Sequence, residues 1–226
     1  MKVIIAPLIG LLAAAPVFSQ TIASWTFESS QPNTSGPIAP ETGAGTASIY
    51  HAAASTYSSP AGNGSSHSYS SNGWSSNDYY QFQTSTLGDT GLTLSWDQTS
   101  SSTGPKDFAL SYSTNAINFT TVENFTVLIN GTPNPAWNAT TKSSLYSNTY
   151  DFSGIGALNN QSMVYFRLTD LDSTAENGAT VATAGTDRVD NFAITAIPEP
   201  STYAALLGAA TLALGFARGR RQQVSS

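Results

Sequence analysis

Residues 90–99 read TGLTLSWDQT, and this stretch gives the strongest evidence for the fold. Apolar residues occupy every second position from 92 to 96, with polar residues between them. Such an alternation places one kind of side chain on each face of a β-strand. The stretch therefore predicts a strand that is half buried against a core.

Similar alternating stretches follow one another along most of the chain, separated by turn residues. They cover 21–28, 78–84, 107–113, 124–130, 163–171 and 188–197. The TNAIN loop at 114–118 and the Asn130-Gly131 pair are predicted to be hairpin connections. Many short strands with almost no helical period predict an all-β fold, an antiparallel β-sandwich spanning residues 20–196. We favour a jelly roll, because the first and last strands look long and regular.

Residues 29–77 interrupt this pattern with a segment rich in Ser, Gly, Asn, Thr, Ala and Pro. No helical period is present there, and the composition favours a loop over the surface. We expect one or two short strands in it, one of them near 48–51. Partial disorder is the alternative.

The N-terminus has the three parts of a secretory signal peptide, residues 1–19. Lys2 precedes an apolar run from 3 to 15, and small or apolar residues at 17 and 19 suit signal peptidase. Cleavage is predicted between Ser19 and Gln20. The alternative is an N-terminal membrane anchor, which the shortness of the run and its Pro and Gly residues disfavour.

The C-terminal segment 197–221 also has three parts. Pro198, Glu199 and Pro200 precede an uncharged stretch from 201 to 217, which is at the lower length limit for a transmembrane helix. The stretch ends at a cluster of arginines: Arg218, Arg220 and Arg221. These arginines are predicted to stop translocation and leave the domain outside the membrane. A buried C-terminal helix is the alternative, and the adjacent arginines disfavour it.

This order of Pro-Glu-Pro, apolar helix and arginine cluster resembles the PEP-CTERM sorting domain of bacterial exported proteins. The resemblance covers 197–221 and leaves 222–226 as a short tail. It implies that exosortase recognises Pro198, Glu199 and Pro200 and that the tail is removed there. The protein would be anchored transiently in the inner membrane and then passed to the cell surface or an exopolysaccharide matrix.

Composition agrees with export. The chain has no cysteine, which excludes disulfides, thiol nucleophiles and zinc-thiolate sites. Thirteen acidic residues between positions 20 and 197 face only four Lys and Arg residues. A surface of this sign without a basic stripe is a poor match for nucleic acid, which we exclude as a partner.

No catalytic residue is assigned. His51 and His67, the two histidines, both lie in the Ser/Gly-rich segment, where a rigidly held catalytic base is not expected. Acidic pairs occur at 170/172 and 187/190, but a glycosidase would need two carboxyls facing each other across a cleft. We therefore predict that the protein is not an enzyme.

Calcium is the cofactor that we consider. Glu28 in WTFE and Asp190 in RVDNF resemble, by their places in the first and last strands, the carboxylates that hold a structural calcium in many jelly-roll carbohydrate-binding modules. Calcium takes six to eight oxygen ligands, which an acidic domain can provide. The alternative is that Asp190 simply decorates an exposed face.

Aromatic residues suggest a ligand. Trp74 and Trp137 lie in loop-like surroundings and are the candidates for contact with a glycan, whereas Trp25 and Trp96 are predicted to fill the core. Two functions therefore remain open. One is a structural or adhesive surface protein that binds polysaccharide, and the other is an exported enzyme that acts on such polymers.

Overall fold

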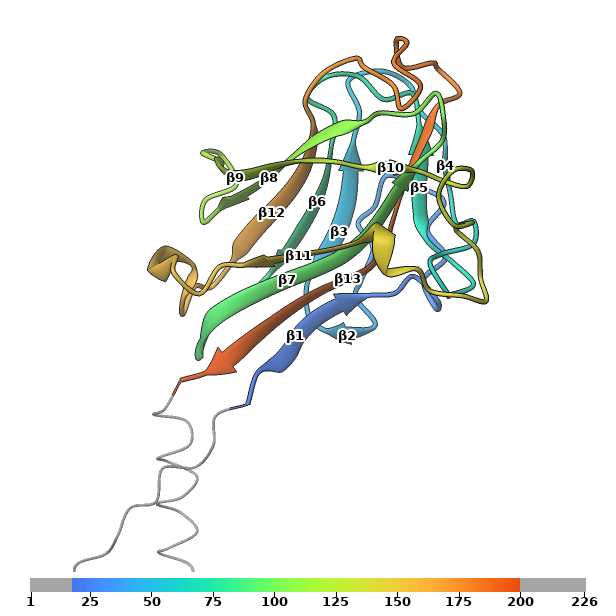
Figure 1. Ribbon diagram of the computed structural model, residues 1–226. Coiled ribbons are helices and arrows are strands. Elements are labelled where there is room, and N and C mark those ends of the chain that lie inside the picture. Colours follow the sequence, from blue (N-terminus) through green and yellow to red (C-terminus); the bar gives the residue numbers. More distant parts are fainter. Residues whose placement is uncertain (1–17, 200–226) are drawn as a thin grey trace, which may run out of the picture. The chain divides into compact units, whose positions relative to one another are not determined.

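The computed structural model describes residues 18–199, and almost all regular structure in this part of the chain is β. Thirteen strands form two sheets that lie face to face as two layers (Figure 1). The helical segments within 18–199 are two 3-10 helices of three residues each, η1 (Ser144–Tyr146) and η2 (Gly156–Leu158). None of the helices described is long and apolar enough to span a bilayer. The predicted all-β sandwich is confirmed.

The large sheet has eight strands built around two long antiparallel ones, β7 (Asp89–Ser100) and β13 (Thr186–Pro198). On the other side of β13 lie β1 (Gln20–Trp25) and then β2 (Thr42–Gly43). Four short strands complete the sheet: β4 (Tyr57–Ser58), β5 (Tyr69–Asn72), β10 (Leu128–Ile129) and β11 (Ser147–Asp151). Only β10 pairs in parallel, with β7, among the strands that the structure describes.

The five-stranded sheet is wholly antiparallel in the order β3-β6-β12-β8-β9. Its strands are β3 (Thr46–Tyr50), β6 (Tyr79–Thr84), β12 (Val164–Asp170), β8 (Asp107–Ser113) and β9 (Thr120–Thr126). The chain moves from one sheet to the other between most successive long strands. Residues distant in sequence therefore meet across the sandwich.

The alternating stretches predicted most of these strands, and the differences are local. The stretch 90–99 is β7, and the loop at 114–118 connects β8 to β9, fixed by Asn115, whose Oδ1 accepts the Asn118 N–H at 2.9 Å. The prediction at 124–130 was wrong, because β9 ends at Thr126 and β10 is a separate strand in the other sheet. The Asn130-Gly131 pair therefore closes no hairpin, and the chain continues through a loop to η1.

The Ser/Gly-rich segment contains more structure than its composition indicates. It provides β2, β3, β4 and β5, and β3 is the strand expected near 48–51. Tyr69 of β5 is fully buried, and its hydroxyl donates to the Thr34 carbonyl at 2.8 Å. Small buried serines such as Ser70 and Ser71 let β5 pack closely on β13.

Aromatic rings from both sheets fill the core. Phe82 of β6 and Phe192 of β13 stack at 3.5 Å between ring centroids, and Trp25 of β1 meets both rings edge-on at 5.3 and 6.0 Å. Trp25 and Trp96 are 0% and 2% exposed, as predicted. Burial of such large apolar surfaces is the main force that holds the two layers together.

A β-bulge interrupts β13 at Asp190 and Asn191. The pairing with β7 shifts between Asp190 and Ala193, and Asn191 has a φ of 50°. A bulge adds one residue to a strand and re-aims the side chains beside it. Because of the bulge, the buried core residues Val189 and Phe192 are three positions apart instead of two. The Asp190 side chain contacts the loop 62–67.

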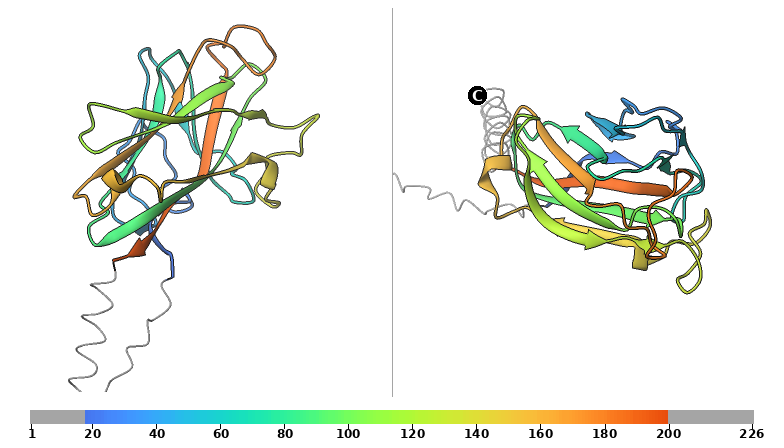
Figure 2. Two further views of the ribbon diagram at one scale, coloured as in Figure 1. Left: turned by 60° about the vertical axis from the view of Figure 1, so that its left-hand side comes forward. Right: turned by 90° about the horizontal axis from the view of Figure 1, so that it is seen from above.

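The first and last described strands end side by side. Gln20 of β1 pairs with Ala196 of β13, so the beginning and the end of the described domain lie side by side at one end of the large sheet (Figure 2). The predicted boundary after residue 196 was two residues early, since Pro198 is buried and still pairs with Asp89 of β7. The Glu199 N–H then donates to the Gly88 carbonyl at 2.8 Å.

Candidate functional site

The outer face of the five-stranded sheet, the side turned away from the large sheet, is the most extensive candidate surface. Three cross-strand rows form it. They are Tyr50, Tyr79, Thr169 and Ala109; Ser48, Gln81, Arg167 and Ser111; and Thr46, Gln83, Tyr165 and Ser113. None of these twelve residues, which come from β3, β6, β12 and β8, is acidic, although the domain carries thirteen carboxylates. This part of the face is therefore neutral to positive, whereas Asp107 of β8 and the exposed Glu123 of β9 lie outside the three rows.

Four planar groups form a stack across this face. The rings of Tyr50 and Tyr79 lie 5.1 Å apart at 17°, and Arg167 Cζ lies 3.8 Å from the centre of Tyr79 and 3.7 Å from that of Phe119. Each group is therefore in contact with the next one, and the stack crosses from β3 over β6 to β12. Tyr50, at one end of the stack, is 50% exposed.

Arg167 is held in one orientation within the stack. Its Nε donates to Gln81 Oε1 at 2.9 Å, and Tyr79 and Phe119 cover both faces of the guanidinium. Partial burial lowers the pKa of Arg167, and Tyr79 acts in the opposite direction. The group remains charged at any physiological pH because its pKa starts far above neutrality. Among residues 18–199 it has no carboxylate partner.

A second candidate site is the loop 62–67, which both predicted calcium ligands contact. Asp190 Oδ2 accepts hydrogen bonds from the Asn63 N–H at 2.9 Å and the Ser65 hydroxyl at 2.5 Å. Glu28 Oε1 accepts the His67 N–H at 2.7 Å. Asp190 is fully buried, so the alternative in which it decorates an exposed face does not hold. Burial raises the pKa of Asp190 to about 6, although its hydrogen bonds act to lower it.

Gly62 lets this loop pack tightly against Asp190. A Cβ on Gly62 would lie 2.0 Å from Ser65 Oγ and 2.3 Å from both Asp190 Oδ2 and the His67 carbonyl oxygen, which is closer than a side chain allows. A hydroxyl, a carboxylate and a carbonyl are oxygen donors of the kind that calcium binds. We call the three residues that carry them, Ser65, His67 and Asp190, the oxygen cradle. In the described part of the chain no group of three or more His, Cys, Asp or Glu side chains gathers to hold a metal.

The two tryptophans predicted to contact a glycan are buried, so that prediction was wrong. Trp74 is 4% exposed, and its Nε1 donates to the Ser71 carbonyl at 3.0 Å. Trp137 is 5% exposed, and its Nε1 donates to the Ala61 carbonyl at 2.7 Å. Both lie in loop-like sequence, but Trp74 packs against Tyr80 and Phe108 of the five-stranded sheet, and Trp137 packs against Tyr146 of η1. The aromatic residues of the outer face, by contrast, belong to the alternating strand pattern.

His51 joins a hydrogen-bonded series that the sequence did not reveal. Its Nδ1 lies 2.8 Å from Asp78 Oδ2 and its Nε2 lies 2.9 Å from Ser71 Oγ. This is the order of groups in a Ser-His-Asp triad. Ser71 is only 1% exposed, however, and the Trp74 ring packs edge-on against the imidazole at 4.7 Å. In this arrangement a substrate cannot reach Ser71, and the series connects β3, β5 and β6.

One end of the sandwich, which we call the acidic end, gathers Asp78, Asp107, Asp170, Asp172 and Glu176. Asp170 is fully buried, and neither of its carboxylate oxygens has a hydrogen-bond partner. Burial, with added repulsion from its acidic neighbours, raises the pKa of Asp170 to about 7. Burial likewise raises the pKa of Glu176 to about 7. These acids are therefore partly protonated near neutral pH.

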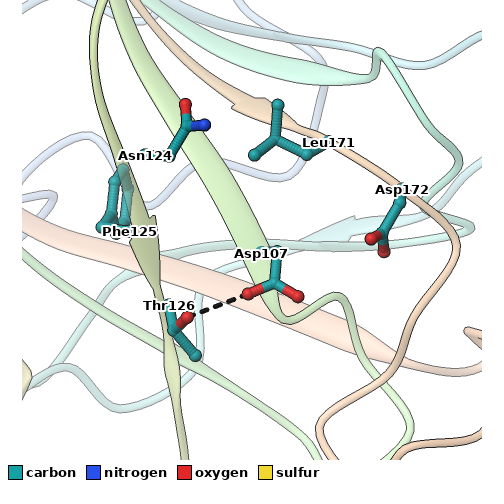
Figure 3. Close-up of a pocket in the computed structure, with 6 residues that line it drawn as sticks. All are labelled: Asp107, Asn124, Phe125, Thr126, Leu171 and Asp172. Atoms are coloured by element: carbon teal, nitrogen blue, oxygen red, sulfur yellow. Dashed lines mark hydrogen bonds between the residues drawn. The ribbon is translucent and has the colours of Figure 1, made fainter.

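An open pocket of about 410 Å³ lies beside this end, lined by Asp107, Asn124, Phe125, Thr126, Leu171 and Asp172 (Figure 3). The Asp107 side chain lies between Thr126 and Asp172, and Asp107 Oδ1 accepts the Thr126 hydroxyl at 2.9 Å. Two acidic, two polar and two apolar residues on a shallow wall do not by themselves define a ligand.

Part of the predicted sorting segment lies within the folded domain. Pro198 is the last residue of β13, and Glu199 is hydrogen-bonded to the turn before β7. Gln20 is the first residue of β1, and Ser19 precedes it as an exposed residue. The rest of the signal peptide before residue 18, Pro200, the predicted membrane helix at 201–217 and the three arginines lie outside the described residues.

Comparison with known proteins gave distant structural matches only. No protein-family model matches the chain, and no curated protein does. One similar solved structure is the CBM22-1–GH10 modules of endo-1,4-β-D-xylanase 10B from Clostridium thermocellum, complexed with xylohexaose. Its TM-score is 0.47 at 15% identity, over 78% of this chain but 28% of that one.

Two smaller proteins match over most of their own length. The K2 cleaved adhesin domain of Lys-gingipain has a TM-score of 0.42 at 17% identity, over 80% of this chain and 99% of that one. TmCBM61 in complex with β-1,4-galactotriose has a TM-score of 0.40 at 10% identity, over 75% and 92%. These are similar all-β folds, and they assign no residue of this chain a role.

Proposed function

We propose that this domain is a polysaccharide-binding or adhesive β-sandwich of jelly-roll type that works outside the cytoplasm. The observation that carries the proposal is the outer face of the five-stranded sheet. It presents tyrosines, the amides of Gln81 and Gln83, and Arg167, with no carboxylate among its twelve residues. Hydroxyl, amide and guanidinium groups are donors and acceptors suited to sugar hydroxyls. Aromatic rings add apolar contact at low entropic cost.

Tyr50→Ala is expected to weaken polysaccharide binding about tenfold without changing stability by more than about 0.5 kcal/mol, because the ring is half exposed and ends the stack. Binding would be measured by affinity electrophoresis and calorimetry against a panel of polysaccharides. Leu145→Ala is the control, since Leu145 is also exposed but lies in η1, beside the large sheet. Equal loss in both variants, or no loss in Tyr50→Ala, would contradict a binding role for the outer face.

The alternative, an exported enzyme that acts on polysaccharide, is tested with the same panel. The buried Ser71-His51-Asp78 series is the observation that keeps it open, because a displacement of Trp74 would expose it. Release of reducing ends or acyl groups by the wild type, abolished in Ser71→Ala, would favour the enzyme. Binding without any product favours the adhesive function.

We also propose that the chain is an exosortase substrate, exported by a signal peptide, anchored transiently in the inner membrane and then delivered to the cell surface or exopolysaccharide matrix. The support is the sequence from Ile197 to Arg221 and its resemblance to PEP-CTERM sorting domains. Pro198 ends the last strand, and Glu199 follows it directly. The motif thus begins where the folded domain ends.

Glu199→Ala is expected to leave export intact and to slow loss of the tail, so that the protein accumulates in the inner membrane. Replacing the three arginines should instead let the whole chain pass through, because nothing then resists translocation. One label in the domain and one after Arg221 would be followed with and without exosortase. If the two labels stay joined to the same extent in every strain, the chain is anchored but not sorted.

We further propose that the oxygen cradle holds a structural calcium ion, with Asp190, Ser65 and the His67 carbonyl as ligands and Glu28 beside them. Bound calcium would neutralise the buried Asp190 carboxylate and fix the loop 62–67 against β13. The support is that both predicted carboxylates, Glu28 and Asp190, contact the loop 62–67, where a hydroxyl and a carbonyl oxygen lie beside the buried Asp190.

A further inference from the structure

We infer that the outer face selects carboxylated polysaccharides, with the Arg167 guanidinium binding a sugar carboxylate. This inference rests on the proposed polysaccharide-binding function and names its ligand class. It is carried by the placement of the cation, the stack that holds it and the absence of an ion-pair partner for it within residues 18–199.

Each of the other three cations of the domain interacts electrostatically with a carboxylate of the chain itself. Lys142 Nζ lies 3.1 Å from Asp97 Oδ2, and Lys106 acts on Glu176. Arg188 lies in the large sheet, where Asp187 stabilises its charge. Among these four cations only Lys142 forms a salt bridge within residues 18–199. Arg167 differs from the other three because the groups that contact it or shift its pKa, Tyr79, Gln81 and Phe119, include no carboxylate. The positive charge of Arg167 is therefore available to pair with a carboxylate of a ligand.

The stack leaves one side of the guanidinium open for that ligand. Tyr79 and Phe119 cover its two faces, and Gln81 takes the Nε hydrogen. Within residues 18–199 no hydrogen bond engages its two terminal nitrogens, Nη1 and Nη2. Two parallel N–H groups match the two oxygens of a carboxylate, and this fixed fork loses little entropy on binding. A neutral sugar offers no equivalent acceptor pair with a full charge.

The net negative charge of the domain repels a carboxylated polysaccharide at long range, and this gives the inference a test that depends on salt. A domain with nine more acids than cations repels a polyanion, and salt screens that repulsion beyond about 8 to 10 Å. The short contact at a partly buried guanidinium is screened much less. Binding should therefore persist or strengthen with added salt. A nonspecific ion-exchange contact would weaken instead.

The test compares matched polymers that differ only in the carboxyl group. Polygalacturonate, alginate and hyaluronate would be offered to the exported domain, each beside its carboxyl-reduced form. We expect at least one acidic polymer to bind about 10- to 100-fold more tightly than its reduced partner, the range for a hydrogen bond to a charged group. This comparison uses the wild-type protein and needs no variant.

Variants then assign the preference to one side chain. Arg167→Gln should remove the preference for the acidic polymer, and Arg167→Lys should keep only part of it, because lysine has the charge without the fork. Lys142→Gln is the control for loss of one positive charge and should change nothing. Melting temperatures would show that each variant is folded.

The outcomes of these experiments distinguish a failure of this inference from a failure of the proposed polysaccharide-binding function. Equal binding of acidic and reduced polymers by the wild type would overturn the inference and leave the polysaccharide-binding function standing. No binding to any polymer, acidic or reduced, would overturn both. A preference that survives in Arg167→Gln would also overturn the inference, because another group would then be responsible.

Discussion

Replacing Asp170 by Asn is expected to raise the free energy of unfolding at pH 8 by about 2 to 3 kcal/mol and to change it little near pH 4. Asp170 is fully buried without a hydrogen-bond partner, so its charged form is costly in the folded domain. The amide has the same shape and no charge. The range allows for partial solvation of the carboxyl.

The sign of the expected change in stability follows from the number of protons that the folded and unfolded states bind. Asp170 has a pKa of about 7 in the folded domain against 3.8 when unperturbed. Below about pH 3.8 it is protonated in both states, and its contribution to stability is fully present. Between there and pH 7 the folded state holds the proton more tightly than the unfolded chain does. Stability therefore falls as the pH rises through this window.

The measurement is urea unfolding followed by tryptophan fluorescence from pH 4 to 8 in the presence of chelator. Burial also raises the pKa values of Glu176, Asp187 and Asp190, so the wild type should lose stability over the same range. Glu123→Gln is the control, since that residue is exposed and is not among the acids that act on Asp170. A variant at Asp170 that is less stable than the wild type at pH 8 would show that the carboxylate is paired in solution.

Calcium is expected to raise the melting temperature by about 5 to 10 °C at an excess of about a hundredfold over its dissociation constant. Ligand binding to the folded state alone contributes about 2.7 kcal/mol under those conditions. In a domain of this size 1 kcal/mol corresponds to about 2 to 4 °C. Asp190→Asn should abolish the shift, and Glu28→Gln should reduce it. Asp172→Asn, at the acidic end, should retain it.

Two further readouts distinguish calcium binding from a purely structural role of Asp190. The shift should shrink below about pH 6, because protons then compete with calcium for the carboxylate. Asp190→Ala should cost about 2 to 4 kcal/mol even with chelator, because the Asn63 N–H and the Ser65 hydroxyl lose their acceptor. An identical melting temperature in calcium and in chelator would exclude the calcium site.

The prediction of strands succeeded where the hydrophobic alternation is strong, and failed where it is weak. β7 and β12 alternate cleanly and were found, whereas β5 is made of tyrosine and small polar residues and was missed. Its serines are buried because β13 and β4 supply their hydrogen-bonded surroundings. Nothing in the local composition distinguishes such a strand from a loop.

The alternation by itself determined the all-β class and placed Trp25 and Trp96 in the core, because side-chain direction in a strand depends only on neighbouring residues. Which distant residues meet was decided by the tertiary structure. The stack of Tyr50, Tyr79 and Arg167 requires the register of three strands, and the burial of Trp74 requires contact with the five-stranded sheet. The direction of Asp190 requires a bulge, which the period-two pattern did not reveal. Register and loop packing are set by the free energy of the whole core, and a local pattern does not contain that information.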